Sequence, residues 1–219
     1  MIDEAKDEAP FRLAKQIIEQ SRRVPLAEGP YIVGISGSPG AGKTTLAKAI
    51  TAELLRHEVA AAYVPMDGFH LADVQLERLG LLSKKGSIST FDAAGYVNLI
   101  KRIKHPDGFT VYAPNFERDL EQPIAGAIPV FPDTNVVITE GNYLLCPDEP
   151  WVQIRTLASQ IWHYQTPTVL RQKRLVARHV ESGKSLQEAT QWVQNVDELN
   201  AQLIEEWAPA ASLIIQHQT

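Results

Sequence analysis

The residues best suited to chemistry in this 219-residue chain form the stretch Gly37-Ser38-Pro39-Gly40-Ala41-Gly42-Lys43-Thr44, which fits the pattern GxxxxGK[ST]. Its glycines omit the Cβ atoms that would keep phosphate oxygens away from backbone N–H groups. Lys43 is placed to reach the β- and γ-phosphates, and the Thr44 hydroxyl is a suitable Mg²⁺ ligand. A glycine-rich turn that binds nothing is the alternative. The pattern favours a site for ATP or GTP.

The elements around this motif are the ones that a phosphate site needs. An unbroken apolar run over residues 31–36 predicts a strand of a parallel sheet with helices on both faces. A helix is predicted over residues 43–57, and its N-terminus adds a dipole that favours anions. Because strand, glycines, Lys-Thr and helix follow in the required order, the phosphate site is the stronger interpretation.

A candidate catalytic base, Asp67, follows a second predicted strand over residues 59–66, which completes a βαβ unit. Sheets of this type bind ligands at the carboxyl ends of their strands. A carboxylate there could accept the proton of a hydroxyl that attacks the γ-phosphate, or hold a water on Mg²⁺. A turn or helix-capping aspartate is the alternative. His70 is expected either to contact the substrate or to close the pocket.

A candidate metal carboxylate, Glu140, ends a buried strand predicted over residues 135–141. In enzymes with such a phosphate loop, an acidic residue at this place holds Mg²⁺ directly or through water. Glu140 is one methylene longer than the usual aspartate. The sequence therefore leaves open whether Glu140 or Asp67 lies nearer the metal.

A helix that starts at residues 166–167 carries Arg171, Arg174 and Arg178 at spacings of three and four, which places them on one face. Three aligned guanidinium groups suit a small helical lid, here residues 167–185, that stabilises charge on a transferred phosphoryl group. A solvated basic stripe is the alternative.

The proline-rich region 109–132 contains the segment Tyr112-Ala113-Pro114-Asn115-Phe116-Glu117-Arg118. Aromatic rings beside an arginine would suit a small polar substrate, so Tyr112 and Arg118 are candidate substrate residues. A surface hairpin with an exposed arginine is an equally good interpretation.

The remaining pattern completes an α/β fold. A capping box, Ser185 to Glu188, opens a long helix predicted to run to residue 207, with Asn200 on its apolar face. That asparagine must find hydrogen-bond partners in the core or on a ligand. Residues 1–9 are expected to be frayed. Further helices are expected over residues 11–24, 71–82 and 93–104, the last capped by Asp92, and strands over 159–164 and 212–216.

Composition excludes several functions. The net charge of −5 argues against nucleic acid as a main partner. The single cysteine, Cys146, predicts a buried thiol in a reducing compartment. The charged start and the lack of long apolar runs predict a cytoplasmic protein without a membrane partner. If the chain self-associates, a homodimer is the commonest form.

With these residues in view, the chain resembles the uridine kinase, phosphoribulokinase and pantothenate kinase family, and most of all its bacterial fructokinase-like (fructose transport system kinase) members. The likeness covers roughly residues 10–216 and is carried by residues 64–71, Lys85-Gly86, 90–92 and 139–145. It implies a P-loop NTPase fold in a single domain over residues 1–219, ATP and Mg²⁺ as cofactors, and a small-molecule substrate. Glu117 stands where the family commonly has aspartate.

The resemblance also implies roles for individual residues. Asp67 takes the position of the catalytic base, residues 37–45 including Thr45 form the ATP site, and Arg174 with Arg178 belongs to the lid. Asn142 joins Asp67, His70, Tyr112 and Arg118 as an expected substrate residue.

We therefore expect an ATP- and Mg²⁺-dependent kinase that phosphorylates a hydroxyl of a sugar or nucleoside. The alternatives are a nucleotide-dependent switch or GTPase, and a regulatory ATP-binding protein. The sequence has no Asn-Lys-x-Asp guanine motif and no Cys/His metal cluster, which disfavours the switch.

Overall fold

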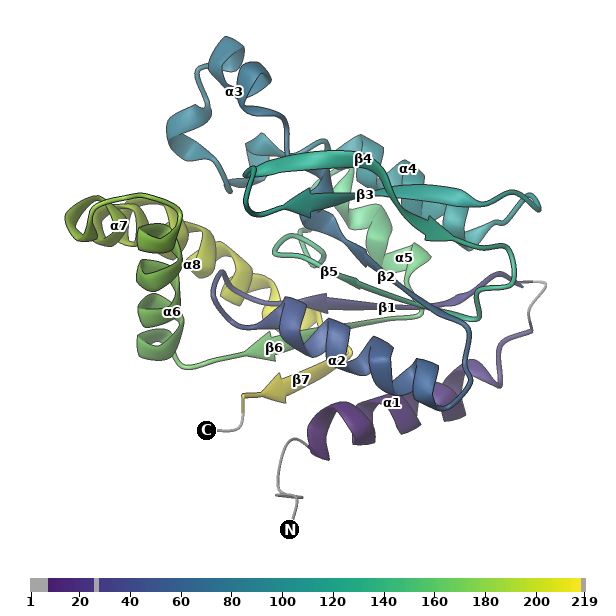
Figure 1. The fold of residues 1–219 in the computed structure, drawn as a ribbon. Helices are drawn as coiled ribbons and strands as arrows, with labels where there is room; N and C mark the ends of the chain where they lie inside the picture. The colour runs from purple at the N-terminus through teal and green to yellow at the C-terminus, as the bar shows by residue number, and fades with distance from the viewer. Residues whose placement is uncertain (1–7, 26–27, 218–219) are drawn as a thin grey trace.

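The computed structural model describes residues 8–25 and 28–217, and a five-stranded sheet of order β2-β5-β1-β6-β7 lies at its centre (Figure 1). Every neighbouring pair of strands is parallel. The strands are β1 (Tyr31–Ser36), β2 (Ala61–Pro65), β5 (Val136–Glu140), β6 (Gln160–Gln165) and β7 (Leu213–Gln216). The predicted α/β fold is confirmed. Residues 1–7, most of the stretch predicted to be frayed, lie outside the described residues.

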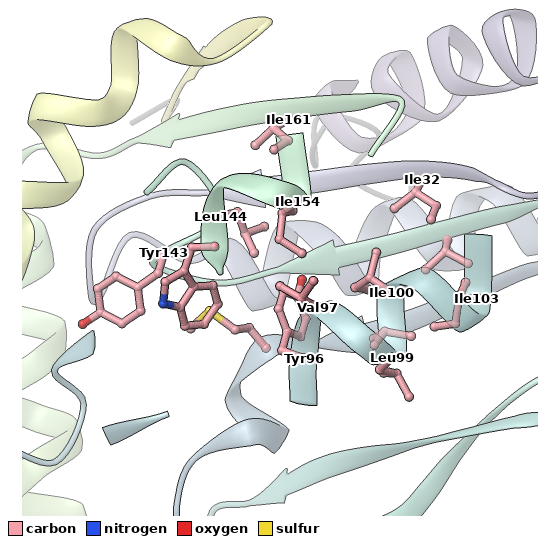
Figure 2. Packing of buried hydrophobic residues seen from close by; sticks show 14 of the residues in the cluster. Ile32, Tyr96, Val97, Leu99, Ile100, Ile103, Tyr143, Leu144, Ile154 and Ile161 are labelled. Atoms are coloured by element: carbon pink, nitrogen blue, oxygen red, sulfur yellow. The ribbon is translucent and has the colours of Figure 1, made fainter. Parts of the chain in front are cut away.

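Helices cover both faces of the sheet because successive side chains of a strand point to opposite sides. In β1, Val33 and Ile35 pack into one apolar cluster and Ile32 packs into the other (Figure 2). The first face is covered by α1 (Glu8–Ser21) and α2 (Lys43–Arg56), and the second by α4 (Ala93–Lys104), α5 (Ile154–Leu157) and α8 (Glu198–Trp207). Since β1 is buried throughout, each face of the strand presents apolar side chains to one layer of helices.

The remaining elements flank the sheet, and three of their helices project beyond its carboxyl edge (Figure 1). On one side lie α3 (Asp73–Leu79), which projects, and the hairpin of β3 (Val111–Glu117) and β4 (Gln122–Val130), which packs along β2 and α4. On the other side α6 (Thr168–Glu181) rises from β6 to α7 (Leu186–Trp192). The space between these two groups is where a ligand at the strand ends would lie.

Two helix predictions are wrong. The helix expected over residues 71–82 covers only Asp73–Leu79, because Gly80 takes a left-handed conformation with φ of 66° and ends it. The single helix expected over residues 185–207 is interrupted by a π-helical segment, Val193–Asp197, that separates α7 from α8. The capping box of Ser185 with Glu188 is confirmed.

Other local predictions hold. The carboxylate of Asp92 accepts a hydrogen bond from the Gly95 N–H at 2.8 Å and caps α4. Cys146 is buried and free, and burial raises the pKa of its thiol. Among the described residues, the helices are too short or too polar to cross a lipid bilayer.

A buried pair of hydroxyl groups ties α4 to the sheet. The Thr139 hydroxyl donates to the Val64 carbonyl at 2.6 Å, and the Tyr96 hydroxyl lies 2.7 Å from the Thr139 oxygen. Since the Thr139 proton is used toward Val64, the Tyr96 hydroxyl is the donor of the second bond.

We expect Thr139→Val to lower the free energy of unfolding by about 1–3 kcal/mol, because it leaves the buried Tyr96 hydroxyl without an acceptor. The double variant with Tyr96→Phe has no such hydroxyl. Its decrease in the free energy of unfolding should therefore be smaller than the sum of the decreases in the two single variants. Urea unfolding of the four proteins measures the difference. Strictly additive losses would contradict this account of the pair.

Candidate active site

The phosphate loop connects β1 to α2, as predicted, and two of its glycines have conformations that few other residues adopt. Gly40 and Gly42 have φ of 75° and 96°. A Cβ atom on Gly40 would also lie 2.8 Å from the backbone oxygen of Arg171 in α6. Glycine at this position therefore leaves room for the backbone of α6 as well as for a phosphate group.

The loop ends at the N-terminus of α2, where Gly42 is the N-cap residue and no side chain makes a capping hydrogen bond. The first backbone N–H groups of a helix have no partner within the helix. Together with the helix dipole they form a site for anions. This geometry fits the phosphates of a nucleotide.

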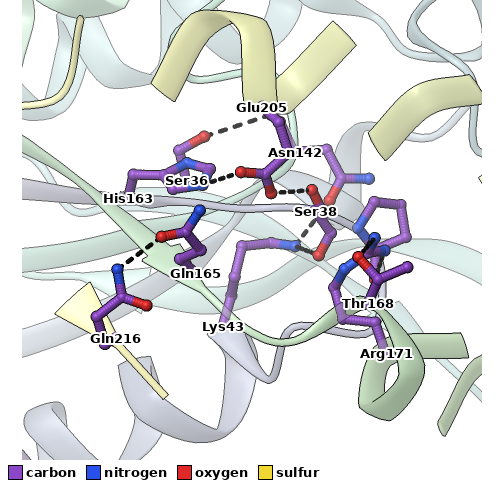
Figure 3. A network of polar contacts seen from close by, with 11 residues as sticks. Ser36, Ser38, Lys43, Asn142, His163, Gln165, Thr168, Arg171, Glu205 and Gln216 are labelled. Atoms are coloured by element: carbon purple, nitrogen blue, oxygen red, sulfur yellow. Dashed lines mark hydrogen bonds and ion pairs between the residues drawn. The ribbon is translucent and has the colours of Figure 1, made fainter. Parts of the chain in front are cut away.

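Lys43, the first residue of α2, has a buried side chain with two hydrogen-bond acceptors (Figure 3). Its ammonium group donates to the Ser38 carbonyl at 3.2 Å and to Oδ1 of Asn142 at 2.7 Å. Burial lowers the pKa of Lys43 to about 8, against the opposing effects of the Glu140 and Asp67 charges. A ligand anion beside this amine would gain a strong electrostatic partner.

The residues expected to hold a metal lie together. The Thr44 hydroxyl donates to Oε1 of Glu140 at 3.0 Å, and the Tyr63 hydroxyl donates to the same oxygen at 2.8 Å. Burial raises the pKa of Glu140, and the charge of Asp67 acts in the same direction. These oxygens are of the type that Mg²⁺ prefers. Across residues 8–25 and 28–217, no group of three or more His, Cys, Asp or Glu side chains could hold a metal, so phosphate oxygens and water would complete its coordination.

Asp67 lies in a short 3-10 helix, Met66–Phe69, directly after β2. Its carboxylate is 3.8 Å from Nη2 of Arg118, and its backbone carbonyl lies 2.9 Å from Nδ1 of His70. The His70 ring packs against Phe91 and Phe116, with centroid distances of 3.9 and 5.0 Å. Burial lowers the pKa of His70. The Asp67 carboxylate thus lies beside an arginine, while its backbone carbonyl contacts a histidine that packs on two aromatic rings.

A cavity of about 970 Å³ joins these groups. Its lining includes most residues singled out in the sequence: Pro39, Gly40, Gly42, Lys43, Thr44, Thr45, Asp67, His70, Arg118, Glu140, Asn142, Arg174 and Arg178. Residues as distant in sequence as Pro39 and Arg178 therefore meet at one place, because parallel strands end at the same edge.

Tyr112 does not belong to this group. It is 61% exposed, while its neighbours Val111 and Ala113 are buried, since alternate residues of β3 face opposite sides. The segment is a hairpin, as one interpretation expected, and a register shift between Ala113 and Asn115 precedes the residues that reach the cavity, Phe116 and Arg118.

The three arginines of α6 divide into two groups. Arg171 is buried and donates to the Pro39 carbonyl and to Glu198, each at 3.2 Å. Arg174 donates to the Ala41 carbonyl at 3.4 Å, and both Arg174 and Arg178 line the cavity. Arg171 and Arg174 therefore both contact the loop, and Arg174 and Arg178 face the cavity.

Several residues around the site were not predicted from the sequence. Glu205 of α8 accepts a hydrogen bond from Ser38 at 2.6 Å, and its second oxygen lies 3.2 Å from Nε2 of the buried His163 (Figure 3). The hydrogen bond with His163 holds the pKa of Glu205 below its ordinary value. The cavity is also lined by Asp73, Lys85, Glu121, His179, Lys184, Trp192 and Asp197. The sequence could have indicated Asp197, because it precedes Asn200 by three residues and so lies on the same face of the predicted helix.

The Nδ2 atom of Asn200 lies 3.5 Å from the carbonyl oxygen of Gly86. The Tyr143 hydroxyl donates to the same carbonyl at 2.6 Å. Asn200 therefore ties α8 to the loop that follows α3.

A glycine-rich loop at the carboxyl edge of an open parallel sheet, with a buried lysine and a Thr–Glu oxygen pair, defines a P-loop nucleotide-binding fold. The chain belongs to the Phosphoribulokinase / Uridine kinase family, whose sequence profile matches residues 32–218. This confirms the resemblance seen in the sequence, and the protein is an enzyme of the small-molecule kinase class.

Individual relatives agree. The crystal structure of a "putative fructose transport system kinase" from Silicibacter sp. TM1040 is 35% identical, with a TM-score of 0.85 over 95% of this chain and 100% of that one. The "Putative uridine kinase C227.14" of Schizosaccharomyces pombe is 28% identical over 94% of this chain and 88% of its own length. YFH7 of Saccharomyces cerevisiae, 18% identical with a TM-score of 0.80 over 96% and 99% of the two chains, shares the fold.

The pKa of Lys43 generates a prediction about nucleotide binding. A bound triphosphate favours the charged ammonium form and so raises its pKa above the value of about 8 in the free protein. Above that pH the free protein has lost a proton that the complex keeps. ATP affinity should therefore fall by up to about tenfold per pH unit from about pH 8 to 9.5, with uptake of a proton on binding.

Calorimetry in two buffers of different ionisation enthalpy measures both quantities. In Lys43→Arg the guanidinium stays charged over this range, so whatever affinity remains should not depend on pH. A pH-independent affinity in the unsubstituted protein would show that Lys43 does not titrate as described.

Proposed function

We propose that this protein transfers the γ-phosphoryl group of ATP, with Mg²⁺, to a hydroxyl group of a small metabolite such as a sugar or a nucleoside. The observation that supports this most is that Lys43 and Asp67 line one cavity. A phosphate-binding amine and a carboxylate base in the same enclosed space are the two parts that transfer to a hydroxyl needs.

At the nucleotide end, Lys43 and the N-terminus of α2 bind the phosphates. Thr44 and Glu140 would hold the metal, and Glu140 is the carboxylate that pairs with the Thr44 hydroxyl, at 3.0 Å. When bound, Mg²⁺ would neutralise charge on the β- and γ-phosphates. A second cavity of about 320 Å³, lined by Gly42, Thr45 and Arg174 among others, would offer room for the nucleoside.

At the acceptor end, Asp67 accepts the proton of the attacking hydroxyl. The hydroxyl oxygen forms a bond to the γ-phosphorus while the bond to the β,γ-bridging oxygen breaks, so that ADP leaves and a phosphate ester remains. Arg118, whose Nη2 atom lies 3.8 Å from the Asp67 carboxylate, orients that carboxylate.

The helix α6 with its following turn, residues 167–185, acts as the lid. Arg174 and Arg178 face the cavity and stabilise charge on the phosphoryl group during transfer. Because Arg171 and Arg174 hydrogen-bond to carbonyls of the phosphate loop, the lid and the loop share contacts.

We expect Lys43→Ala to lower kcat by about 10² to 10³ or more, as loss of a single stabilising donor does elsewhere. Asp67→Asn keeps the size of the side chain but cannot take the proton, and a general base contributes about 10² to 10⁴. ADP release measured with a panel of sugars, nucleosides, pantothenate and glycerate tests both variants.

Lys101→Ala, an exposed substitution on α4, is the matched control and should retain full turnover. Acceptor-dependent turnover that Asp67→Asn leaves intact would remove Asp67 as the base. Slow ATP hydrolysis that no acceptor accelerates would favour a regulatory ATP-binding protein instead.

A further inference from the structure

One end of the main cavity is lined by residues that the proposed phosphoryl transfer does not use. His179 and Lys184 come from the end of α6 and its following turn, Trp192 from α7, and Asp197 from the π-helical segment. His179 lies five residues beyond Arg174, or about 7.5 Å farther along the helix from the phosphate loop. Figure 1 shows this end of α6 meeting α7, on the side that projects beyond the sheet.

A histidine and an aspartate form a close pair there. Nε2 of His179 lies 2.8 Å from Oδ2 of Asp197, and their side chains are 14% and 10% exposed. A carboxylate accepts hydrogen bonds, so Nε2 of the imidazole is the donor. Oδ1 of Asp197 and Nδ1 of His179 make no hydrogen bond to the rest of the described chain.

That unused oxygen needs a partner. A carboxylate that is nine-tenths withdrawn from solvent is costly unless donors surround it. Asp197 lines the cavity, so its second oxygen can accept a hydrogen bond from water there or from a ligand that replaces the water. The donors that small metabolites offer to a carboxylate are chiefly hydroxyl groups.

The backbone supports this placement of Asp197. It is the last residue of the π-helical segment Val193–Asp197, which separates α7 from α8. Such wide turns cost hydrogen-bond geometry and are frequent at functional sites. Here the wide turn sets the carboxylate against His179 rather than continuing the exposed face of α7.

The charges at this end disfavour an anionic ligand. Lys85 donates to Asp73 and to the Glu121 carbonyl, each at 2.7 Å, and Arg118 is paired with Asp67. Lys184 lies over the Trp192 ring at 4.7 Å. Each of these cations already has an acidic or aromatic partner, while the open oxygen of Asp197 would repel a carboxylate or phosphate.

We infer that His179 and Asp197 form the recognition site for the phosphate acceptor, that they bind adjacent hydroxyl groups of a neutral polyhydroxy compound, and that they exclude anionic acceptors. Trp192 provides an apolar surface for the carbon skeleton of that compound. This inference rests on the proposed kinase function and narrows its substrate class.

The test compares probes that differ in charge at one end: fructose with fructose 6-phosphate, uridine with uridine 5′-monophosphate, panthenol with pantothenate, and glycerol with glycerate. Only neutral members should be phosphorylated by the unsubstituted protein. Asp197→Asn should raise KM for the neutral acceptor by about 10- to 100-fold, the range expected for a lost hydrogen bond to a charged group. It should leave KM for ATP within about twofold and reduce the preference for neutral over anionic probes.

His179→Gln keeps an N–H donor toward Asp197, so its KM effect should be smaller than that of Asp197→Asn. It also carries the test if Asp197→Asn does not fold. Glu206→Gln removes an exposed carboxylate from α8 and should behave like the unsubstituted protein. Equal KM changes for ATP and acceptor in Asp197→Asn, or thermal destabilisation without a KM change, would assign the pair a merely structural role and overturn the inference.

The remaining outcomes separate this inference from the kinase proposal. Turnover of anionic probes alone would overturn the inference and leave the kinase standing. If no probe is phosphorylated, calorimetry with a nonhydrolysable ATP analogue present decides. Binding of a neutral probe that Asp197→Asn abolishes would support the site without the kinase activity, and no binding of any neutral probe would overturn the site.

Discussion

The buried ammonium group of Lys43 is the constraint on which the rest of the site depends. A charge withdrawn from water must be paired, and this one has the Ser38 carbonyl at 3.2 Å and the Asn142 side chain at 2.7 Å. Ser38 follows β1 and Asn142 follows β5, so two neighbouring parallel strands must end at the same level. The same register brings Glu140 within 3.0 Å of Thr44. The pairing of this amine and the contact of Thr44 with Glu140 therefore depend on the same strand register.

The loop is also held from the side of the lid. Its residues Ser38, Pro39 and Ala41 contact Glu205, Arg171 and Thr166, at 2.6, 3.2 and 2.8 Å. Two of these partners lie in α8 and α6, the helices on either side of the π-helical segment and α7. Positions of the loop and of the cavity walls are consequently set by one connected group of hydrogen bonds. This arrangement suits a reaction in which positioning and electrostatics supply most of the catalysis.

Sequence reasoning succeeded where the chemistry is local. The motif around Lys43, the strand ends at Asp67 and Glu140, and the caps at Asp92 and Ser185 each depend on residues within a few positions of one another. It failed where partners are distant: Ser38 and Glu205 are 167 positions apart, and no periodicity connects them. Tyr112 was a candidate substrate residue because its side chain is aromatic. In the structure, the alternation of side chains along β3 directs this ring to solvent.

The π-helical segment is the clearest limit on prediction from pattern. Apolar residues at helical spacing continue through residues 193–197, so the period alone predicts one uninterrupted helix. The wide turn occurs together with tertiary contacts that join α6 to this segment, among them the pair of His179 with Asp197 at 2.8 Å. Contacts of this kind override local propensity.

In the proposed reaction, phosphate leaves ATP only for a hydroxyl held at Asp67. Phosphorus NMR of the reaction with ATP, Mg²⁺ and an accepted neutral probe tests it most directly, since it separates phosphate ester from inorganic phosphate in one spectrum. The account predicts one equivalent of phosphate ester for each ADP formed. Inorganic phosphate in place of the ester, at the same rate with and without the probe, would contradict it.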